Sequence, residues 1–330
     1  MRRYAVSTRS SSLGLSARPV SKGKNMQGIS CDNISKSYEN GKKALDGIGF
    51  SFGERGIISV IGRNGAGKTT LTRILATELM PNSGHAEIDG IDVVADPGPI
   101  RERIAIVPQE SRPIGWLTCK QAVVTYLLYR GYGYSEASSR AMESLRKIGI
   151  DQYANTLSRK LSGGTKRKLT IATVLASDAK IIFLDEPTTG LDPISRNELW
   201  GMLEHLKKDY LIFLTTHYLE EAERLADKIA IMEMGRLLAF GTMDELRKKV
   251  RYEYAIRIGD RKRPRCKLKE GAYVTGSDGT EQIFTSKAEA FTISQQLIKE
   301  GTSFSSNPLS LEDIFYYIVK MRLSEDYGEK

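Results

Sequence analysis

The sequence predicts an α/β protein built on a mainly parallel sheet, and three observations support this class. Short, continuously apolar segments such as GIISVIG, KIIFLDEP and YLIFLTTH alternate with segments of helical periodicity. Strands that are apolar on both faces are typical of a parallel sheet covered by helices on each side. At 330 residues, 40% of them hydrophobic, the chain is long enough for one large domain and a smaller one.

The N-terminal strands are expected to form a small antiparallel β subdomain. Residues 26–61 show short alternating segments, which ENGKK interrupts at 39–43. The Asn40-Gly41 pair in that interruption is typical of a tight β-hairpin turn, because both residues tolerate positive φ angles. We therefore expect a hairpin ahead of the apolar strand GIISVIG.

The middle of the chain is expected to alternate between strands and helices. A periodic helix from Lys68 to about Leu79 precedes the strand-like segments HAEIDG and RIAIVPQ. A helical pattern over 118–157 then predicts a helical subdomain inserted at about 116–160. The remaining predicted elements are strands at 180–187, 210–217 and 228–235 and helices at 195–208 and 218–226.

The domain limits follow from changes in pattern and composition. The periodicity weakens beyond residue 250, so we place the large α/β domain at 26–249 and a small α+β accessory domain at 250–330. Residues 1–25 hold six basic residues and no acid, and they are rich in serine. This composition predicts a disordered tail. A true start at Met26 is the alternative, and both are favoured over a targeting peptide.

Charge and cysteine content restrict the class of protein. The net charge of +9 is concentrated in the tail, and the basic run at 261–269 has no interleaved aromatics, so we expect no nucleic-acid partner. No apolar run reaches the roughly 18 residues that a membrane span needs. Cys31, Cys119 and Cys266 lack the spacing of a disulfide framework or a zinc site, which fits a reducing cytosol.

GRNGAGKTT fits the pattern GxxxxGK[ST] and lies between a predicted strand and a predicted helix. Glycines let backbone N–H groups wrap a polyphosphate, the lysine adds positive charge, and the hydroxyl after it reaches Mg²⁺. The strand and helix in register favour this interpretation over an accidental glycine-rich turn. The predicted nucleotide-binding residues here are Gly62, Arg63, Asn64, Gly65, Ala66, Gly67, Lys68, Thr69 and Thr70.

IIFLDEP supplies the acidic groups that phosphoryl chemistry needs. Four apolar residues form a buried strand that ends at Asp185 and Glu186, whose side chains point in different directions. Such a pair is often only solvated, but the phosphate loop favours a functional role. We predict that Asp185 binds Mg²⁺ and that Glu186 is the general base that activates water.

LSGGTKRKL predicts a second anion site, at the start of a helix. Free N–H groups and the positive dipole end of such a helix point at an anion. The residues expected to bind are Ser162, Gly163 and Gly164. A chain with a phosphate loop would then have two phosphate sites, which raises the question of whose phosphate the second one holds.

Together these motifs resemble the ATP-binding cassette (ABC) family of ATPases, the nucleotide-binding subunits of transporters. The resemblance covers about residues 30–248, with Ser162 placed 23 residues before Asp185. It implies a P-loop NTPase core, with ATP and Mg²⁺ as the bound groups, and ATP hydrolysis as the activity.

The resemblance also implies roles for four further residues. Tyr38 is similar to the aromatic that stacks on adenine, although it could instead pack on the sheet as a hairpin residue. Gln109 resembles the glutamine that touches Mg²⁺ or the attacking water, and His217 resembles the histidine that contacts the γ phosphate. Asp192, in GLDP, resembles the loop residue that lies across the dimer interface.

In the resembling family two cassettes pair head to tail, and each ATP lies between one phosphate loop and the partner's Ser-Gly-Gly helix start. The second phosphate site would thus serve a second copy of this chain. The family most often has glutamine after the two glycines, whereas this chain has Thr165. We expect this shorter side chain to weaken the contact with the nucleotide sugar modestly.

The segment that begins TTHYLEEAERLADKIA and the terminal SLEDIF resemble cassettes of drug, lipid or ion exporters. The resemblance implies an exporter ATPase, peripheral on the cytoplasmic face of the membrane, that drives a separate transmembrane permease. A soluble ABC ATPase acting in translation or on DNA is the alternative. A phosphate-loop kinase is disfavoured because it leaves LSGG and His217 unexplained.

Overall fold

The computed structural model describes residues 28–53, 55–250, 252–259, 271–275 and 281–327. The predicted disordered tail, the candidate start Met26 and the basic run at 261–269 lie outside these residues. No helix in the described part of the chain is long and apolar enough to span a membrane.

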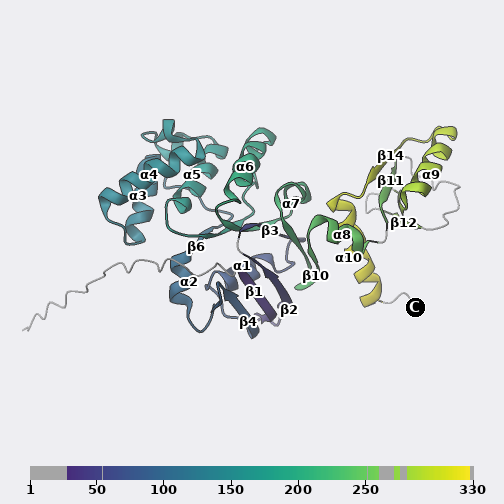
Figure 1. The fold of residues 1–330 in the computed structure, drawn as a ribbon, viewed down its shortest axis with the longest axis horizontal. Coiled ribbons are helices and arrows are strands. Elements are labelled where there is room, and N and C mark those ends of the chain that lie inside the picture. The colour runs from purple at the N-terminus through teal and green to yellow at the C-terminus, as the bar shows by residue number, and fades with distance from the viewer. Residues whose placement is uncertain (1–27, 54, 251, 260–270, 276–280, 328–330) are drawn as a thin grey trace, which may run out of the picture.

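The centre of the molecule is the predicted parallel sheet (Figure 1). Its strand order is β10-β9-β3-β8-β7-β6, and every neighbouring pair is parallel except β9 with β10. The strands are β3 (Gly56–Ile61), β6 (Ile104–Val107), β7 (Ile181–Asp185), β8 (Leu211–Thr216), β9 (Lys228–Glu233) and β10 (Arg236–Gly241). Strands β3 and β8 are buried along their whole length, as their continuous apolar character predicts.

A smaller antiparallel sheet, of order β2-β1-β4-β5, precedes and flanks the central one. Its strands are β1 (Ile29–Ser37), β2 (Lys43–Phe52), β4 (Ser83–Ile88) and β5 (Ile91–Asp92). The predicted hairpin is confirmed: Gly41 has φ 77° and its N–H donates to the carbonyl of Tyr38. Ile34 and Ile48 of this sheet share a core with Ile58 of the central sheet.

Helix α1 (Lys68–Leu75) follows β3, and α2 (Pro97–Arg103) precedes β6. The prediction that α1 continues to Leu79 was wrong by about one turn. Thr77 adopts a left-handed φ of 61°, and the N–H groups of Glu78 and Leu79 both turn back to the carbonyl of Arg73. This geometry closes the helix early.

One face of the central sheet is covered by α5 (Gly163–Leu175) and the two helices packed on it, α3 (Cys119–Tyr129) and α4 (Tyr134–Ile148). Val123, Leu145 and Leu169 share one large core with Ile182 and Ile212 of the sheet. Two 3₁₀ turns, Asp151–Tyr153 and Ser158–Lys160, join α4 to α5. Helices α6 (Pro193–Leu206) and α7 (Leu219–Leu225) follow β7 and β8.

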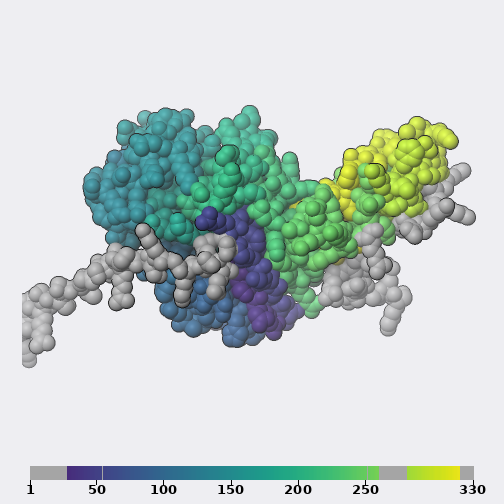
Figure 2. Space-filling model, viewed as in Figure 1, coloured from purple at the N-terminus to yellow at the C-terminus, as the bar shows by residue number. Residues whose placement is uncertain are grey.

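The C-terminal part contains a four-stranded antiparallel sheet of order β12-β13-β11-β14, and it forms a separate lobe in Figure 2. Its elements are α8 (Met243–Lys249), β11 (Tyr254–Ile258), β12 (Gly271–Thr275), β13 (Glu281–Thr285), α9 (Lys287–Lys299), β14 (Phe304–Pro308) and α10 (Leu311–Tyr327). Leu311 and Ile314 of α10 pack back into a core with Ile231 and Leu246. The C-terminal helix therefore joins the two lobes.

Candidate functional site

The phosphate loop connects β3 to α1 in a conformation that requires its glycines. Gly65 and Gly67 have φ angles of 84° and 102°, which residues with a side chain rarely adopt. A Cβ at Gly62 would lie 2.3 Å from the carbonyl oxygen of Met232, and one at Gly67 would lie 2.5 Å from that of Ala44. Packing against these neighbours holds the main chain of the loop in place.

Lys68 is buried within the loop that it follows. Its ammonium group donates to the carbonyls of Gly62 (2.8 Å) and Arg63 (3.3 Å). Burial lowers the pKa of Lys68, and the charges of Glu186 and Asp185 oppose that change. The cation is thus directed toward the inside of the loop, beside both predicted acids.

Thr69 and Asp185 face each other across the end of β7. The Thr69 hydroxyl lies 3.5 Å from one carboxylate oxygen of Asp185, whose other oxygen accepts a hydrogen bond from the Thr215 hydroxyl. A hydroxyl and a carboxylate are oxygen ligands of the kind that Mg²⁺ prefers. No group of three or more His, Cys, Asp or Glu side chains in the described residues could hold a metal alone. Phosphate oxygens and water would complete the coordination of such an ion.

Glu186 is the point at which the predicted catalytic residues meet. Its Oε2 accepts hydrogen bonds from Gln109 Nε2 (3.1 Å) and Thr189 Oγ1 (3.0 Å) and lies 3.0 Å from His217 Nδ1. The side chain is only 11% exposed. Its backbone has a φ of 45°, a strained angle for a glutamate, and its N–H donates to the Thr215 carbonyl.

Tyr38 lies at the edge of the phosphate loop. Its hydroxyl shares a 3.2 Å hydrogen bond with the hydroxyl of Thr70, and its ring is half-buried. It also lines a surface pocket with Leu79 and the adjoining hairpin residues. The structure therefore places this aromatic beside the phosphate loop.

A second group of predicted site residues lies at the start of α5 and consists of Ser162, Gly163 and Gly164. Ser162 caps the helix, with its Oγ accepting from the N–H of Thr165. A Cβ at Gly164 would lie 2.6 Å from Ser195 Oγ, so only glycine fits there. Ser162 and Gly163 are exposed.

Asp192 lies next to this group, because it binds Ser195, the residue against which Gly164 packs. Asp192 caps α6 by accepting from the N–H groups of Ile194 and Ser195 (both 3.0 Å) and from Ser195 Oγ (2.6 Å). These bonds lower the pKa of Asp192, the Ser195 hydroxyl most. No hydrogen bond or ion pair among the described residues joins Ser162–Gly164 or Asp192 to the phosphate loop. The predicted site is therefore divided into two groups.

Four residues that the sequence did not single out support these groups. Thr215 and Thr189 hold the two acids, Ser195 joins Gly164 to Asp192, and Arg167 lies buried behind β7. The threonines could have been suspected from their places near strand ends, because Thr215 is the second-last residue of β8 and Thr189 lies four residues after β7. Nothing in the sequence indicates that Arg167 is buried.

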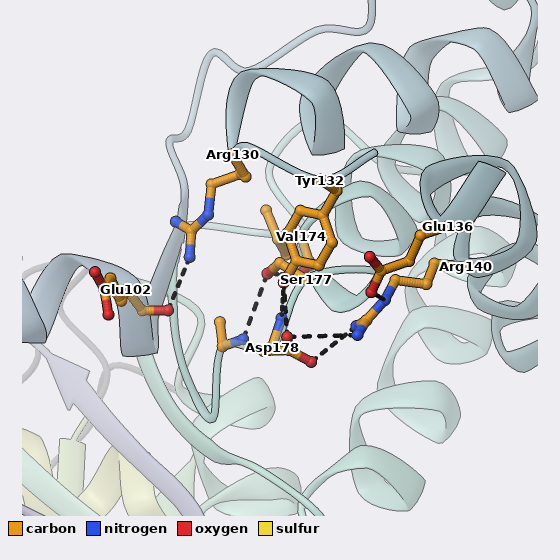
Figure 3. Close-up of polar contacts among 9 residues, drawn as sticks. Glu102, Arg130, Tyr132, Glu136, Arg140, Val174, Ser177 and Asp178 are labelled. Carbon is orange, nitrogen blue, oxygen red and sulfur yellow. Dashed lines mark hydrogen bonds and ion pairs between the residues drawn. The ribbon is translucent and has the colours of Figure 1, made fainter. Parts of the chain in front are cut away.

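A groove of about 600 Å³ lies between the central sheet and α3, with Tyr126, Arg130 and Ile106 in its lining. Arg130 closes one side by donating to the carbonyls of Glu102 (2.9 Å) and Ile104 (3.2 Å), as Figure 3 shows in part. Close by in the same figure, Asp178 accepts from Tyr132 (2.9 Å) and Arg140 (2.8 Å). These contacts fix the turn between α3 and α4 to the end of α5.

Comparisons with known proteins agree with this geometry. Residues 45–189 match the family described as ABC transporter. Over 220 residues the chain is 38% identical to the daunorubicin/doxorubicin resistance ATP-binding protein DrrA of Streptomyces peucetius and 39% identical to DrrA3 of Streptomyces coeruleorubidus. The match covers 66% of this chain and 66% and 69% of those proteins.

A longer match extends beyond the α/β domain. The chain is 31% identical over 316 residues to the human phospholipid-transporting ATPase ABCA3, covering 89% of this chain but only 18% of that protein. Among solved structures, the dimeric post-hydrolysis state of the ATP-binding cassette MJ0796 with ADP and Pi has a TM-score of 0.58 at 25% identity, over 65% of this chain and 98% of that one. The chain belongs to the ATP-binding-cassette family and is an ABC transporter ATPase with a P-loop NTPase core.

Proposed function

We propose that this chain is the ATPase subunit of an ABC exporter, in which two copies close on two ATP molecules and drive a separate membrane permease. The observation that carries the proposal is the convergence of Gln109, His217 and Glu186 beside the phosphate loop. A glycine-rich phosphate loop alone is common to many nucleotide enzymes. This convergence is the arrangement that hydrolysis by a positioned water requires.

In the proposed reaction Glu186 is the general base. It accepts a proton from water as the water oxygen bonds to the γ phosphorus, and the bond from that phosphorus to the β–γ bridging oxygen breaks to release ADP. The three groups around Oε2 keep the carboxylate oriented. His217 is placed to contact the γ phosphate, and Gln109 to touch the attacking water or the metal.

The remaining residues of the first group bind and orient the nucleotide. Lys68 would turn its charge from the loop carbonyls to the β and γ phosphates, while the loop N–H groups wrap them. Thr69, Asp185 and Gln109 would hold Mg²⁺, which would supply positive charge to offset that of the phosphates. Tyr38 would stack on adenine at the edge of the loop.

The second group supports a head-to-tail dimer. Ser162, Gly163 and Asp192 are exposed and lie apart from the phosphate loop of their own chain. An anion-binding helix start that its own nucleotide does not use is suited to the γ phosphate of a partner's ATP. Hydrolysis would then remove the contact that holds the two copies together. The similar MJ0796 cassette was solved as a dimer, which supports this arrangement.

The groove beside α3 is the surface on which we propose that the permease docks. A short cytoplasmic helix of the permease would fit a groove of this volume. Exposed aromatics also stand just before α3 and at its last residue, Trp116 and Tyr129. Its wall leads through β6 to Gln109, so docking and catalysis would communicate over a few residues. On this proposal the chain works on the cytoplasmic face of a membrane.

The export direction rests on the relatives, which are named for drug resistance and phospholipid transport.

The test of the proposed function is purification of the tagged chain from its native membranes, together with an ATPase assay. We expect a multi-span membrane protein to co-purify and Glu78→Arg, in the groove lining, to release it. Glu143→Arg, on the exposed side of α4, should not. A membrane-free assembly with ribosomes or DNA would overturn the proposal.

A further inference from the structure

Arg167 occupies an unexpected place for a residue so near the start of an anion-binding helix. It lies on α5, five positions after Ser162, and is only 7% exposed. Its guanidinium points away from the exposed helix start. It donates three hydrogen bonds, to the carbonyls of Pro187 (Nε, 2.9 Å), Pro108 (3.1 Å) and Asp185 (3.1 Å).

These three acceptors surround the proposed catalytic residues along the main chain. Pro108 directly precedes Gln109, and Asp185 and Pro187 stand on either side of Glu186. Pro108 directly follows β6, Asp185 is the last residue of β7, and Pro187 comes two residues after it. Strands β6 and β7 are neighbours in the central sheet. One planar, rigid guanidinium therefore fixes the backbone of two separate catalytic segments at once.

The contact is chemically unusual because the cation is buried against neutral acceptors. No carboxylate in the described residues forms an ion pair with Arg167, although the more distant charges of Asp185 and Glu221 favour its charged form. Burial lowers the pKa of Arg167 to about 10, so it remains charged at neutral pH. A charged donor to three carbonyls gives stronger hydrogen bonds than a neutral one.

The same helix carries the exposed half of the site. Its first turn holds Ser162 and Gly164, and Gly164 packs against Ser195 beside Asp192. A displacement of α5 when a partner's phosphate binds at Ser162 would move Arg167, and with it the backbone on both sides of Glu186. Helix α5 would thus connect the surface that meets the partner's nucleotide with Gln109 and Glu186, the groups that act on the nucleotide bound by the same chain.

We propose that Arg167 is a positioning residue that couples the two ATP sites of the dimer. It aligns Gln109 and Glu186 of its own chain in response to the nucleotide bound at the Ser162 end of α5. This inference rests on the proposed function, because it requires the head-to-tail dimer. A purely structural arginine would stabilise the fold without linking the two sites.

The test compares Arg167→Met and Arg167→Lys with Lys168→Met. Lys168 is the next residue of α5, and its ammonium pairs with Glu198 at 2.7 Å, away from the strand ends. For each full-length protein we would measure hydrolysis against ATP concentration, the affinity for a fluorescent ATP analogue under dilute, monomeric conditions, and the melting temperature.

For the unmodified protein we expect a Hill coefficient that approaches about 2, the number of sites. Arg167→Met should lower kcat by about tenfold to a hundredfold, as misplaced catalytic groups do. Its Hill coefficient should fall to about 1, while monomer affinity for the analogue stays within about twofold. Arg167→Lys replaces three separate donor nitrogens with a single ammonium that cannot span the same acceptors, so it should be intermediate. Lys168→Met should match the unmodified protein.

A folded Arg167→Met protein with an unchanged Hill coefficient would overturn the inference, as would an equal loss of kcat and monomer affinity. If Arg167→Met fails to fold, the outcome rests on Arg167→Lys: full cooperativity and kcat in that variant would overturn the inference. An unmodified protein that hydrolyses ATP without cooperativity and never dimerises would instead contradict the proposed function.

Discussion

The hydroxyl of Thr165 lies 2.8 Å from the hydroxyl of Ser162, the residue that caps α5. The N–H of Thr165 also donates to the same Ser162 oxygen at 3.2 Å. Thr165 therefore engages Ser162 within its own helix start, at the position where the family resemblance led us to expect glutamine. The partner's phosphate would have to compete for the Ser162 hydroxyl.

Replacing Thr165 by glutamine should strengthen the ATP-bound dimer. The longer amide would release the Ser162 hydroxyl and reach the nucleotide sugar, and one gained hydrogen bond contributes about 1 kcal/mol, or roughly fivefold in dimer affinity. Sedimentation of the ATP-bound protein against its concentration measures this. Thr165→Val, which removes the hydroxyl without adding reach, is the control. A weaker dimer in the glutamine variant would contradict the prediction.

Glu186→Gln should abolish most turnover but preserve nucleotide binding. The amide cannot accept the proton of water, and general-base catalysis typically contributes about a hundredfold or more. We expect an ATP-bound dimer to accumulate, which gel filtration with radiolabelled ATP would detect. Glu198→Gln on the surface of α6 is the matched control. Near-normal turnover in Glu186→Gln would refute the role of this residue.

Ser162→Arg should separate hydrolysis from nucleotide binding. Ser162 is exposed, and no hydrogen bond among the described residues joins it to the phosphate loop of its own chain, so monomer affinity for ATP should be retained. A bulky cation at the helix start should block the partner's nucleotide and reduce hydrolysis by about tenfold or more, as loss of a charge-stabilising contact does. Paired affinity titrations and turnover assays measure the two effects. An equal loss of both would show that Ser162 supports its own nucleotide.

Local sequence patterns predicted the elements that position the site. The Asn40-Gly41 turn, the strands before the phosphate loop and before Asp185, and the helix after LSGG all occur where they were expected. Their signals are local, since turn residues, apolar runs and helix caps act within a few positions. The roles of the individual site residues remain predictions.

The features that were missed depend on contacts between distant segments. The buried side chain of Arg167 depends on where β6 and β7 end, and its neighbours Lys166 and Lys168 suggest an exposed helix face. The early end of α1 depends on the left-handed Thr77, a conformation that threonine rarely adopts. The packing of Ile314 on the cassette likewise joins residues far apart in the chain.

Glu221 provides a test of stability against pH. This carboxylate on α7 is fully buried, and its Oε1 accepts from Trp200 Nε1 at 3.0 Å. Burial raises the pKa of Glu221, while hydrogen bonds such as that from Trp200 and the charge of Arg196 oppose the change. The folded protein thus holds the carboxyl proton more tightly than the unfolded chain does.

The sign of the effect follows from proton linkage. Stability from a raised carboxyl pKa is fully present below the ordinary pKa of glutamic acid and is lost as the pH rises through the folded value. Glu221→Gln cannot ionise and keeps an oxygen that accepts from Trp200. The free energy of unfolding of the unmodified protein should therefore fall relative to Glu221→Gln as the pH rises from about 4.5, the ordinary pKa of this group.

Urea unfolding of both proteins across this pH range measures the difference, and Glu220→Gln, its exposed neighbour, controls for the general loss of an acid. The opposite result would be a Glu221→Gln protein that becomes less stable than the unmodified protein as the pH rises. That result would mean that the fold stabilises the ionised carboxylate, with Arg196 as its partner. The expected slope would instead assign Glu221 a neutral, hydrogen-bonded role between α6 and α7, the helices that follow the strands ending at Asp185 and Thr216.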